Sequence, residues 1–187
     1  MIYSVIASLD GYVNDSEGGF AWARPDAEVH AFVNDQEREI GTYLYGRRLY
    51  ETMVAWETMD TRGVPELEDY AQLWRAADKV VYSTTLEGVS SERTRLERAF
   101  DPVAAWAIEG TVSVGGPGLA AHALRAGLVH ELRLIVVPAI VGSGTPWLPP
   151  DLRLDLHLLD EHRFASGFVA LRYAVSGQGL REAEEGD

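Results

Sequence analysis

Three short stretches of the sequence contain glycine, two of them beside charged or hydroxyl-bearing residues, and all follow directly after apolar runs that resemble strands. They are SLDG at 8–11, GRR at 46–48 and GGPG at 115–118. In an open parallel sheet, ligands bind outside the carboxyl ends of the strands. If the three apolar runs are parallel strands, all three stretches open on one edge of the sheet. The sequence therefore predicts a ligand site at that edge.

The GGPG turn has a composition suited to binding a phosphate. Without side chains in the way, its backbone N–H groups can approach a phosphate at the start of the following helix. Gly116, Gly118 and Ala121 also fit the relaxed dinucleotide pattern G-x-G-x-x-A. The match lies more than halfway along the chain, and no acidic residue ends the next strand, which argues against a Rossmann domain. We therefore interpret the match as a phosphate turn of another fold, and the alternative is an ordinary tight strand-to-helix turn.

Arg47 and Arg48 follow Gly46 at the expected start of a helix. The dipole and unpaired N–H groups at a helix N-terminus favour anions, so two cations are unexpected there. Either both side chains extend into solvent, or they bind an anion through forked, charge-assisted hydrogen bonds. Taken alone, the solvent explanation is favoured. With GGPG on the same edge, a ligand carrying two phosphates becomes the better explanation.

Strand-like runs and helix-like periodicities alternate along the chain. Asp26 and Asp101-Pro102 are typical helix starts, and Gly41, Gly110 and Gly127 are expected helix ends. Expected strands are 2–9, 42–45, 79–83, 111–114, 132–137, 152–159 and 168–175, and expected helices are 26–41, 47–56, 66–77, 101–110 and 119–126. This order predicts an α/β fold: a mixed, mainly parallel sheet with helices on both faces and an antiparallel C-terminal edge.

The composition is that of a globular protein. The 187 residues suit one domain, expected over 1–175, with an acidic flexible tail at 176–187. A net charge of −13 argues against nucleic-acid binding, and the absence of cysteine excludes disulfides and thiol nucleophiles. No window approaches the ~18–20 apolar residues of a membrane span. The first residues lack a basic leader, so we expect a cytoplasmic protein with no membrane partner.

The histidines and tryptophans carry weaker signals. None of the five histidines has metal-ligand spacing, and His157 and His162 are expected on opposite faces of one strand, so no metal site is predicted. Trp22 and Trp56 lie near expected loops or helix ends. There they could stack on a planar substrate, although packing over the core is the more common role of such aromatic residues.

Five motifs, in this order and at roughly these separations, resemble the dihydrofolate reductase superfamily, and within it the reductase domain of riboflavin biosynthesis, the RibD C-terminal type. The motifs are IASLDGYV, LYGRRLYET, VVYSTTL, SVGGPGL and ELRLIVVPAIVGSGTPWL. The resemblance spans residues 2–175. It implies a mixed sheet of about eight strands, NADPH as cofactor, hydride transfer to a ring or imine of a small molecule, and a homodimer.

The resemblance also implies roles for individual residues. Gly46, Arg47 and Arg48 would hold the adenosine phosphates, and Ser83 and Thr84 would lie beside the 2′-phosphate. The pyrophosphate would lie on the GGPG turn and the residue after it, namely Gly115, Gly116, Pro117, Gly118 and Leu119. The segment from Ala7 to Asp10 would line the nicotinamide and substrate cleft. Many relatives carry Arg or Lys where Thr84 stands, and Thr where Leu49 stands, so NADH is possible as well as NADPH.

The substrate side of the resemblance is less defined. The region where dihydrofolate reductases place a pterin-binding carboxylate offers Asp26, Glu28 and His30 without a clear counterpart. Asp10 or His30 could donate a proton if its pKa is shifted, while Asp10 could equally be a turn residue. The sequence thus predicts an NAD(P)H-dependent reductase of a heterocyclic or aminopyrimidine-like compound. The alternative is a non-catalytic nucleotide-binding protein that keeps the cofactor cleft.

Overall fold

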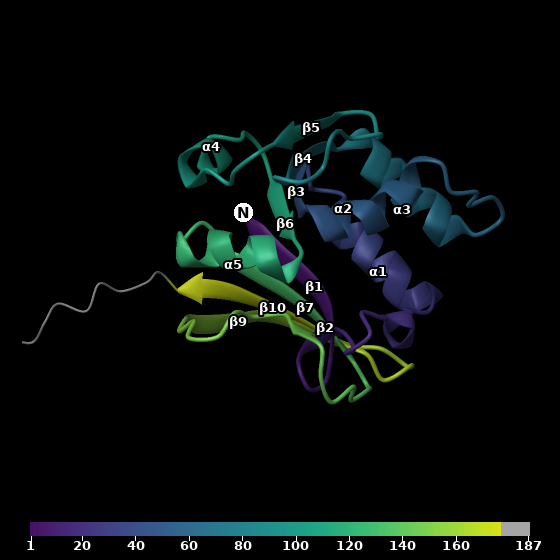
Figure 1. Ribbon diagram of the computed structural model, residues 1–187. Coiled ribbons are helices and arrows are strands. Elements are labelled where there is room, and N and C mark those ends of the chain that lie inside the picture. The colour runs from purple at the N-terminus through teal and green to yellow at the C-terminus, as the bar shows by residue number, and fades with distance from the viewer. Residues whose placement is uncertain (177–187) are drawn as a thin grey trace, which may run out of the picture.

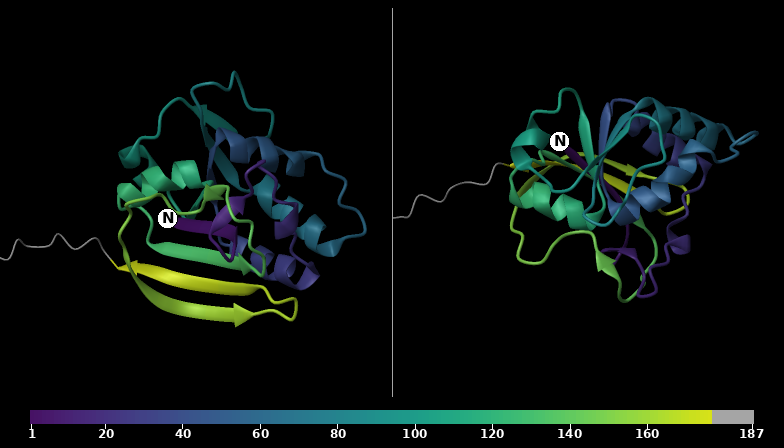
Figure 2. Two further views of the ribbon diagram at one scale, coloured as in Figure 1. Left: turned by 60° about the horizontal axis from the view of Figure 1, so that its bottom comes forward. Right: turned by 45° about the horizontal axis from the view of Figure 1, so that its top comes forward.

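The computed structural model describes residues 1–176. Eight strands form one sheet in the order β5-β4-β3-β6-β1-β7-β10-β9 (Figure 1). Their bounds are β1 Ile2–Ser8, β3 Thr42–Gly46, β4 Asp78–Tyr82, β5 Thr94–Glu97, β6 Val112–Gly115, β7 Glu131–Val137, β9 Asp155–Arg163 and β10 Val169–Ser176. In this sheet β10 alone runs against the other strands, pairing antiparallel with β7 and with β9 (Figure 2). The predicted mainly parallel sheet with an antiparallel C-terminal edge is confirmed.

Helices cover both faces of the sheet. The α-helices are α1 Ala27–Glu37, α2 Arg47–Met53, α3 Pro65–Ala76, α4 Pro102–Trp106 and α5 Pro117–Arg125, and the 3₁₀ turns are η1 Ala21–Ala23 and η2 Val54–Glu57. In Figure 1, α5 lies on one side of the sheet and α1, α2 and α3 lie on the other. The arrangement matches the predicted α/β architecture.

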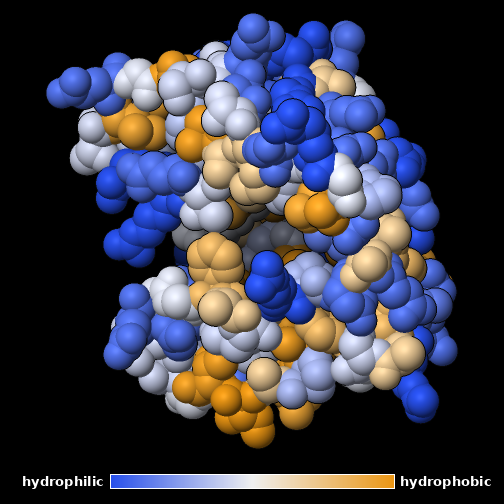
Figure 3. All heavy atoms as spheres, turned by 90° about the vertical axis from the view of Figure 1, so that its right-hand side faces the viewer, coloured by the Kyte–Doolittle hydropathy of each residue, from blue (hydrophilic) through white to orange (hydrophobic). Residues whose placement is uncertain are grey.

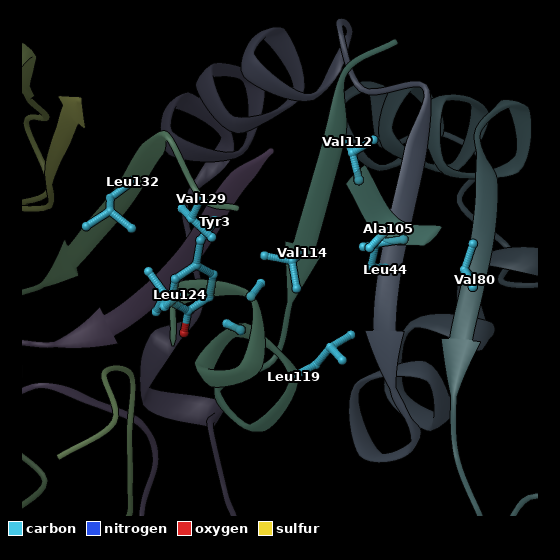
Figure 4. Packing of buried hydrophobic residues seen from close by; sticks show 12 residues of the cluster. Tyr3, Leu44, Val80, Ala105, Val112, Val114, Leu119, Leu124, Val129 and Leu132 are labelled. Carbon is cyan, nitrogen blue, oxygen red and sulfur yellow. The ribbon is translucent and has the colours of Figure 1, made fainter. Parts of the chain in front are cut away.

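The main apolar core fills the space between the sheet and α5. Leu119 and Leu124 of α5 pack against Tyr3, Leu44 and Val114 from three neighbouring strands (Figure 4). All five side chains are buried. Separate buried clusters form under α2 and α3 and under α1. Packing on both faces holds the central strands in place, and with them the loops at their carboxyl ends.

Two predicted helix starts have the expected chemistry. The Asp26 carboxylate accepts from Val29 N at 2.9 Å, and the Asp101 carboxylate accepts from Val103 N at 2.9 Å. Each satisfies an N–H group that has no partner within its helix. Pro102 stands in the first turn of α4, where its missing N–H costs nothing.

Several predicted boundaries are wrong. Helix α1 ends at Glu37 rather than Gly41, because Gly41 already donates to Thr111 O at 2.9 Å as the chain enters the sheet. In the second helix the α-helical part ends at Met53 and a 3₁₀ turn continues it. Helix α4 stops at Trp106, well before Gly110. Strand β9 begins at Asp155 rather than at residue 152.

Three strands were not predicted. Strand β5 has the sequence TRLE, which has little apolar content. It is a strand because it pairs with β4, and not because of its own sequence pattern. Strands β2 Tyr12–Asn14 and β8 Thr145–Pro146 form a small antiparallel ribbon apart from the main sheet. Such short strands carry too few residues for a periodicity to show.

A β-bulge overturns the prediction for two histidines. His157 pairs with Ala174 and His162 pairs with Ala170, with a register shift between Arg172 and Tyr173. Directly opposed residues share a face of the sheet, so both histidines lie on the same face and not on opposite ones. The extra residue of the bulge reverses the alternation. Among residues 1–176, no group of histidines and carboxylates is arranged to hold a metal ion.

Strand β10 includes Ser176, the first residue of the predicted tail. The rest of the predicted tail, 177–187, lies outside the described residues. Within the described residues, no helix has the length and apolar content needed to cross a membrane.

Candidate functional site

The three glycine-containing stretches lie on one edge of the sheet, as the sequence predicts. They follow β1, β3 and β6, and β6 pairs in parallel with both of the other strands. Since parallel strands end at the same edge, the residues after Ser8, Gly46 and Gly115 are grouped in space. This is the edge at which open α/β sheets bind ligands.

A cleft of about 420 Å³ opens at this edge, between the ends of β3 and β4 and the start of α5. Its lining includes six of the predicted residues, Gly46, Arg47, Ser83, Thr84, Gly118 and Leu119. The others are Tyr82, Thr85, Arg98, Ala99, Phe100 and His122. Residues from four separate parts of the chain thus line one site, and they include two arginines and four residues with hydroxyl groups.

Five of the predicted cofactor residues do not line the cleft: Ala7, Arg48, Gly115, Gly116 and Pro117. Ala7 is buried inside β1, where it pairs with Val136 of β7. Arg48, the residue after Arg47 in the first turn of α2, is exposed. The structure therefore separates the two arginines that the sequence treats as a pair.

The arginine that faces the cleft is Arg47. Its Nη1 lies 3.2 Å from the Glu51 carboxylate, one turn further along α2. Both side chains are about half exposed, and exposed pairs of this kind are weak. Arg47 therefore remains available to an anion in the cleft.

The glycines of the GGPG turn have different roles. A Cβ on Gly115 would lie 2.5 Å from Leu49 Cδ2 and 3.2 Å from the Tyr45 ring, so Gly115 is required for packing. Gly116 has a φ of 83°, a conformation that side chains disfavour. A Cβ on Gly118 would meet nothing within 4 Å. Only Gly118 therefore has the open space that a ligand would use.

The turn after β4 is organised by a serine hydroxyl. Ser83 Oγ accepts from Thr85 N at 3.2 Å and from Leu86 N at 3.0 Å. Its backbone N–H donates to Glu97 O of β5 at 2.9 Å. The Ser83 hydroxyl thus shapes the turn, and the neighbouring Thr84 is presented at the cleft.

Sequence reasoning missed the wall formed by Arg98, Ala99 and Phe100. These residues follow β5, the strand that lacks an apolar pattern, so nothing located them beside β4. Phe100 packs edge-on against Tyr82, with ring centroids 5.3 Å apart, and lies 6.1 Å from the His122 ring. His122 had a usable signal, because it is four residues after Gly118 and shares its face of the helix.

On the substrate side, Asp10 is engaged with backbone. Its two carboxylate oxygens accept from Val141 N at 3.2 Å and from Gly142 N at 2.7 Å. Hydrogen bonding by the Ser8 hydroxyl and by these amides lowers the pKa of Asp10 below its ordinary value. In this environment the carboxylate is ionised at neutral pH and joins the loop after β1 to the loop after β7.

His30 and Trp56 belong to an aromatic cluster between α1, α3 and η2. The His30 ring lies 5.8 Å from Tyr70 and 6.3 Å from Trp56, and its Nδ1 lies 3.2 Å from Asn34 Oδ1. Trp22 sits in the 3₁₀ turn before α1, and its Nε1 donates to Gly19 O at 3.2 Å. The structure does not bring Trp22 into contact with Trp56 or with the cleft lined by Arg47.

The chain belongs to the family of the RibD C-terminal domain, whose model matches residues 1–169. This confirms the resemblance found in the sequence. A curated relative, the uncharacterized protein YyaP of Bacillus subtilis (strain 168), is 25% identical over 190 residues, which cover 95% of each chain.

Solved structures agree on the fold. A protein of Shewanella sp. PV-4 assigned to riboflavin biosynthesis superposes with a TM-score of 0.71 at 17% identity, covering 94% of this chain and 98% of that one. The deaminase and 5-amino-6-(5-phosphoribosylamino)uracil reductase of Thermotoga maritima gives 0.64 at 12% identity, covering 94% and 56%. A pyrimidine reductase-like protein of Corynebacterium diphtheriae gives 0.65 at 16% identity, covering 94% and 91%. The fold is thus that of the riboflavin-type reductases.

Proposed function

We propose that this protein is an NAD(P)H-dependent reductase that transfers hydride to a small heterocyclic or aminopyrimidine-like substrate. Membership of the RibD C-terminal domain family supports a reductase of the riboflavin type. The observation that carries the proposal is the cleft at the carboxyl edge, which joins Arg47, Thr84 and Gly118 in one site.

The cleft fits an anionic nucleotide. The protein has a net charge of −13, yet two arginines line this one cleft. Beside them, Gly118 has no side chain, and a Cβ at that position would meet nothing within 4 Å, which leaves open space for a phosphate. Helix α5 begins there with no acidic residue in its first turn and no side-chain cap. Its N-terminal N–H groups are therefore available to a phosphate.

In this proposal the residues that line the cleft bind different portions of the cofactor. Arg47 and Thr84 hold the phosphates of the adenosine portion, and Gly118 and Leu119 hold the pyrophosphate. A bound NADPH or NADH supplies the hydride. The protein contributes position and the exclusion of water, so no covalent catalytic residue is required.

The substrate would bind near the ends of β1 and β7. The side of the molecule that carries α1 and α3 in Figure 1 is hollowed near its middle, and hydrophobic residues border part of the hollow (Figure 3). Trp22 and Trp56 are the proposed aromatic contacts of the substrate, and His30 is the proposed proton donor. Asp10, held as an ionised carboxylate, orients the loops of this region.

A nucleotide-binding protein without catalysis is the second candidate. It is favoured by Leu49, which packs against Gly115 and stands where the resembled family carries a threonine. Its side chain brings no hydroxyl to the turn. Binding of NADPH without oxidation by any of a panel of pterins, quinones and aminopyrimidines would support this candidate over the reductase.

The proposal is tested by titrating the protein with NADPH and NADH, following tryptophan quenching and nicotinamide fluorescence. We expect a dissociation constant below about 100 µM for at least one cofactor, within the range typical of enzymes and their substrates. Arg47→Ala should weaken binding about 10-fold or more, because it removes a charge-assisted contact. Arg48→Ala is the matched control and should bind as the wild type does. Binding of neither cofactor at millimolar concentration would overturn the proposal.

A homodimer is part of the same proposal. Edge strand β9 carries three leucines, Leu156, Leu158 and Leu159, which are 43–49% exposed. Exposed apolar edges of this kind are commonly covered by another chain. Light scattering at several protein concentrations would show a mass of about twice 20.6 kDa if a second copy covers the edge.

A further inference from the structure

Arg98 lies on the wall of the cleft just after β5, at a position that no sequence motif indicates. Its Nη1 donates to Ser83 O at 3.2 Å and to Leu86 O at 2.6 Å. Both carbonyls belong to the turn that follows β4. These bonds hold the guanidinium against the turn that contains Thr84. Residues 83–86 of this turn include no cation, and Arg98 brings one to it from the end of β5.

The charge of Arg98 is not neutralised within residues 1–176. Arg47, the other arginine of the cleft, forms an ion pair with Glu51, whereas Arg98 forms none in this part of the chain. Arg98 uses Nη1 for the two carbonyls, and its Nε and Nη2 have no acceptor among the described residues. A guanidinium carries five N–H donors in a planar fork that matches phosphate oxygens. The remaining donors are therefore suited to an anion in the cleft.

The same wall carries an aromatic surface. Phe100, two residues after Arg98, contacts Tyr82 and lies close to His122 across the cleft. Aromatic faces beside cations suit a purine nucleoside that carries a phosphate. The end of the cleft at Arg98 thus fits the adenosine portion of a dinucleotide.

We infer that Arg98 is a specificity-determining residue that binds the phosphomonoester on the adenosine ribose and so selects NADPH over NADH. The inference rests on the proposed nicotinamide-dependent function. NADH lacks that phosphomonoester and gains nothing from the guanidinium. Selection by Arg98 replaces selection by a cation at the position of Thr84.

The experiment measures the dissociation constants of NADPH and NADH separately for the wild type, Arg98→Met and Arg98→Lys. We expect the wild type to bind NADPH at least about 10-fold more tightly than NADH, as a charge-assisted phosphate contact would produce. In Arg98→Met, NADPH should weaken about 10- to 100-fold while NADH changes less than about 2-fold. Arg98→Lys should recover part of the preference, because it keeps the charge without the fork.

Two controls separate the possible failures. Arg125→Met removes one positive charge from an exposed position at the end of α5, outside the cleft, and should leave both constants unchanged. If loss of Arg98 only loosens the turn at 83–86, NADPH and NADH weaken by the same factor, which overturns the inference. Equal affinity of the wild type for the two cofactors also overturns it while leaving the proposed function intact. Binding of neither cofactor overturns both.

Discussion

The cleft beside β3, β4 and α5 and the loops after β1 and β7 lie on the same edge of the sheet, yet their polar residues are arranged differently. In the cleft, Arg47 and Arg98 extend donors into open space and Gly118 leaves room beside them. At the end of β1, Asp10 directs both oxygens to backbone amides, and His30 packs among aromatic rings between two helices.

This difference separates a surface built to accept a ligand from one in which polar groups support the fold. In the cleft, Nε and Nη2 of Arg98 have no acceptor among the described residues, and Arg47 has only a half-exposed ion pair with Glu51, so water or a ligand can accept from these donors. Around β1 the polar groups already have partners. The residues proposed to bind the cofactor are therefore visible in the structure, whereas the proposed substrate would contact a region whose shape the Asp10 contacts maintain.

The largest expected effect comes from closing the cleft at Gly118. Gly118→Glu would place a carboxylate in the space where a phosphate is proposed, and like-charge contact costs several kcal/mol. We expect cofactor affinity to fall about 100-fold or more, with no loss of thermal stability, because an acidic residue in the first turn favours a helix. Isothermal titration and a thermal melt would measure the two quantities.

Gly118→Ala is the matched control for that substitution. Its methyl group meets nothing within 4 Å, so binding should be retained within a few-fold. If Gly118→Glu binds NADPH as well as the wild type does, the cleft is not the phosphate site and the contrast between the two regions fails.

The next effect is expected at Gly115, three residues earlier in the same turn. Gly115→Ala forces a methyl group to within 2.5 Å of Leu49 Cδ2 and 3.2 Å of the Tyr45 ring. Leu49 can move its far end, but Tyr45 is buried, so we expect destabilisation of about 1–3 kcal/mol. Urea denaturation would measure it.

A double-mutant cycle with Leu49→Ala would attribute the cost at Gly115. If the clash with Leu49 dominates, the double variant should be less destabilised than the sum of the two single variants. Additive effects would indicate that Tyr45, and not Leu49, makes glycine necessary. Either way, Gly115 would act on stability and Gly118 on binding, within one four-residue motif.

The sequence indicated the strand ends correctly because the central strands are continuous apolar runs buried on both faces. Glycine and arginine after such runs are visible in the sequence, so Gly46, Arg47 and Gly118 could be assigned to one edge. The sequence could not indicate which of the two neighbouring arginines, Arg47 or Arg48, faces the cleft. Arg47 and Arg48 are neighbours in sequence but about 100° apart on a helix, and only the packing of α2 decides between them.

Arg98 shows the second limit of sequence reasoning. Strand β5 is a strand because it pairs with β4, and its TRLE sequence carries no apolar period of its own. Residues that reach a site from such an element have no local signal. The bulge in β9 likewise has no local signal in the sequence. It arises from the pairing of β9 with β10, and it places His157 and His162 on the same face of the sheet instead of on opposite faces.

A smaller effect is expected at His30, which tests whether the substrate side is mainly structural. His30→Ala removes edge-to-face contacts with Tyr70 and Trp56 and a hydrogen bond to Asn34. We expect a loss of about 1–2 kcal/mol in the free energy of unfolding, with unchanged cofactor affinity. His157→Ala, exposed on β9, is the control and should leave stability unchanged. Because His30 is also the proposed proton donor, turnover should fall as well, and turnover equal to that of the wild type would remove His30 from that role.

The smallest expected effect is local and concerns Asp10. Its pKa is lowered in the folded protein, so its contacts with Val141 N and Gly142 N are complete above the ordinary aspartate value of about 3.9. They are lost only as the pH falls through the lowered folded value. The Gly142 amide resonance should therefore titrate with a midpoint below that of a free aspartate.

Asp10→Asn should abolish the titration and speed amide exchange at 141 and 142, while Asp160→Asn should not. A midpoint above the ordinary value would make Asp10 protonated more readily than expected, restore it as a proton donor, and remove the contrast between the two regions.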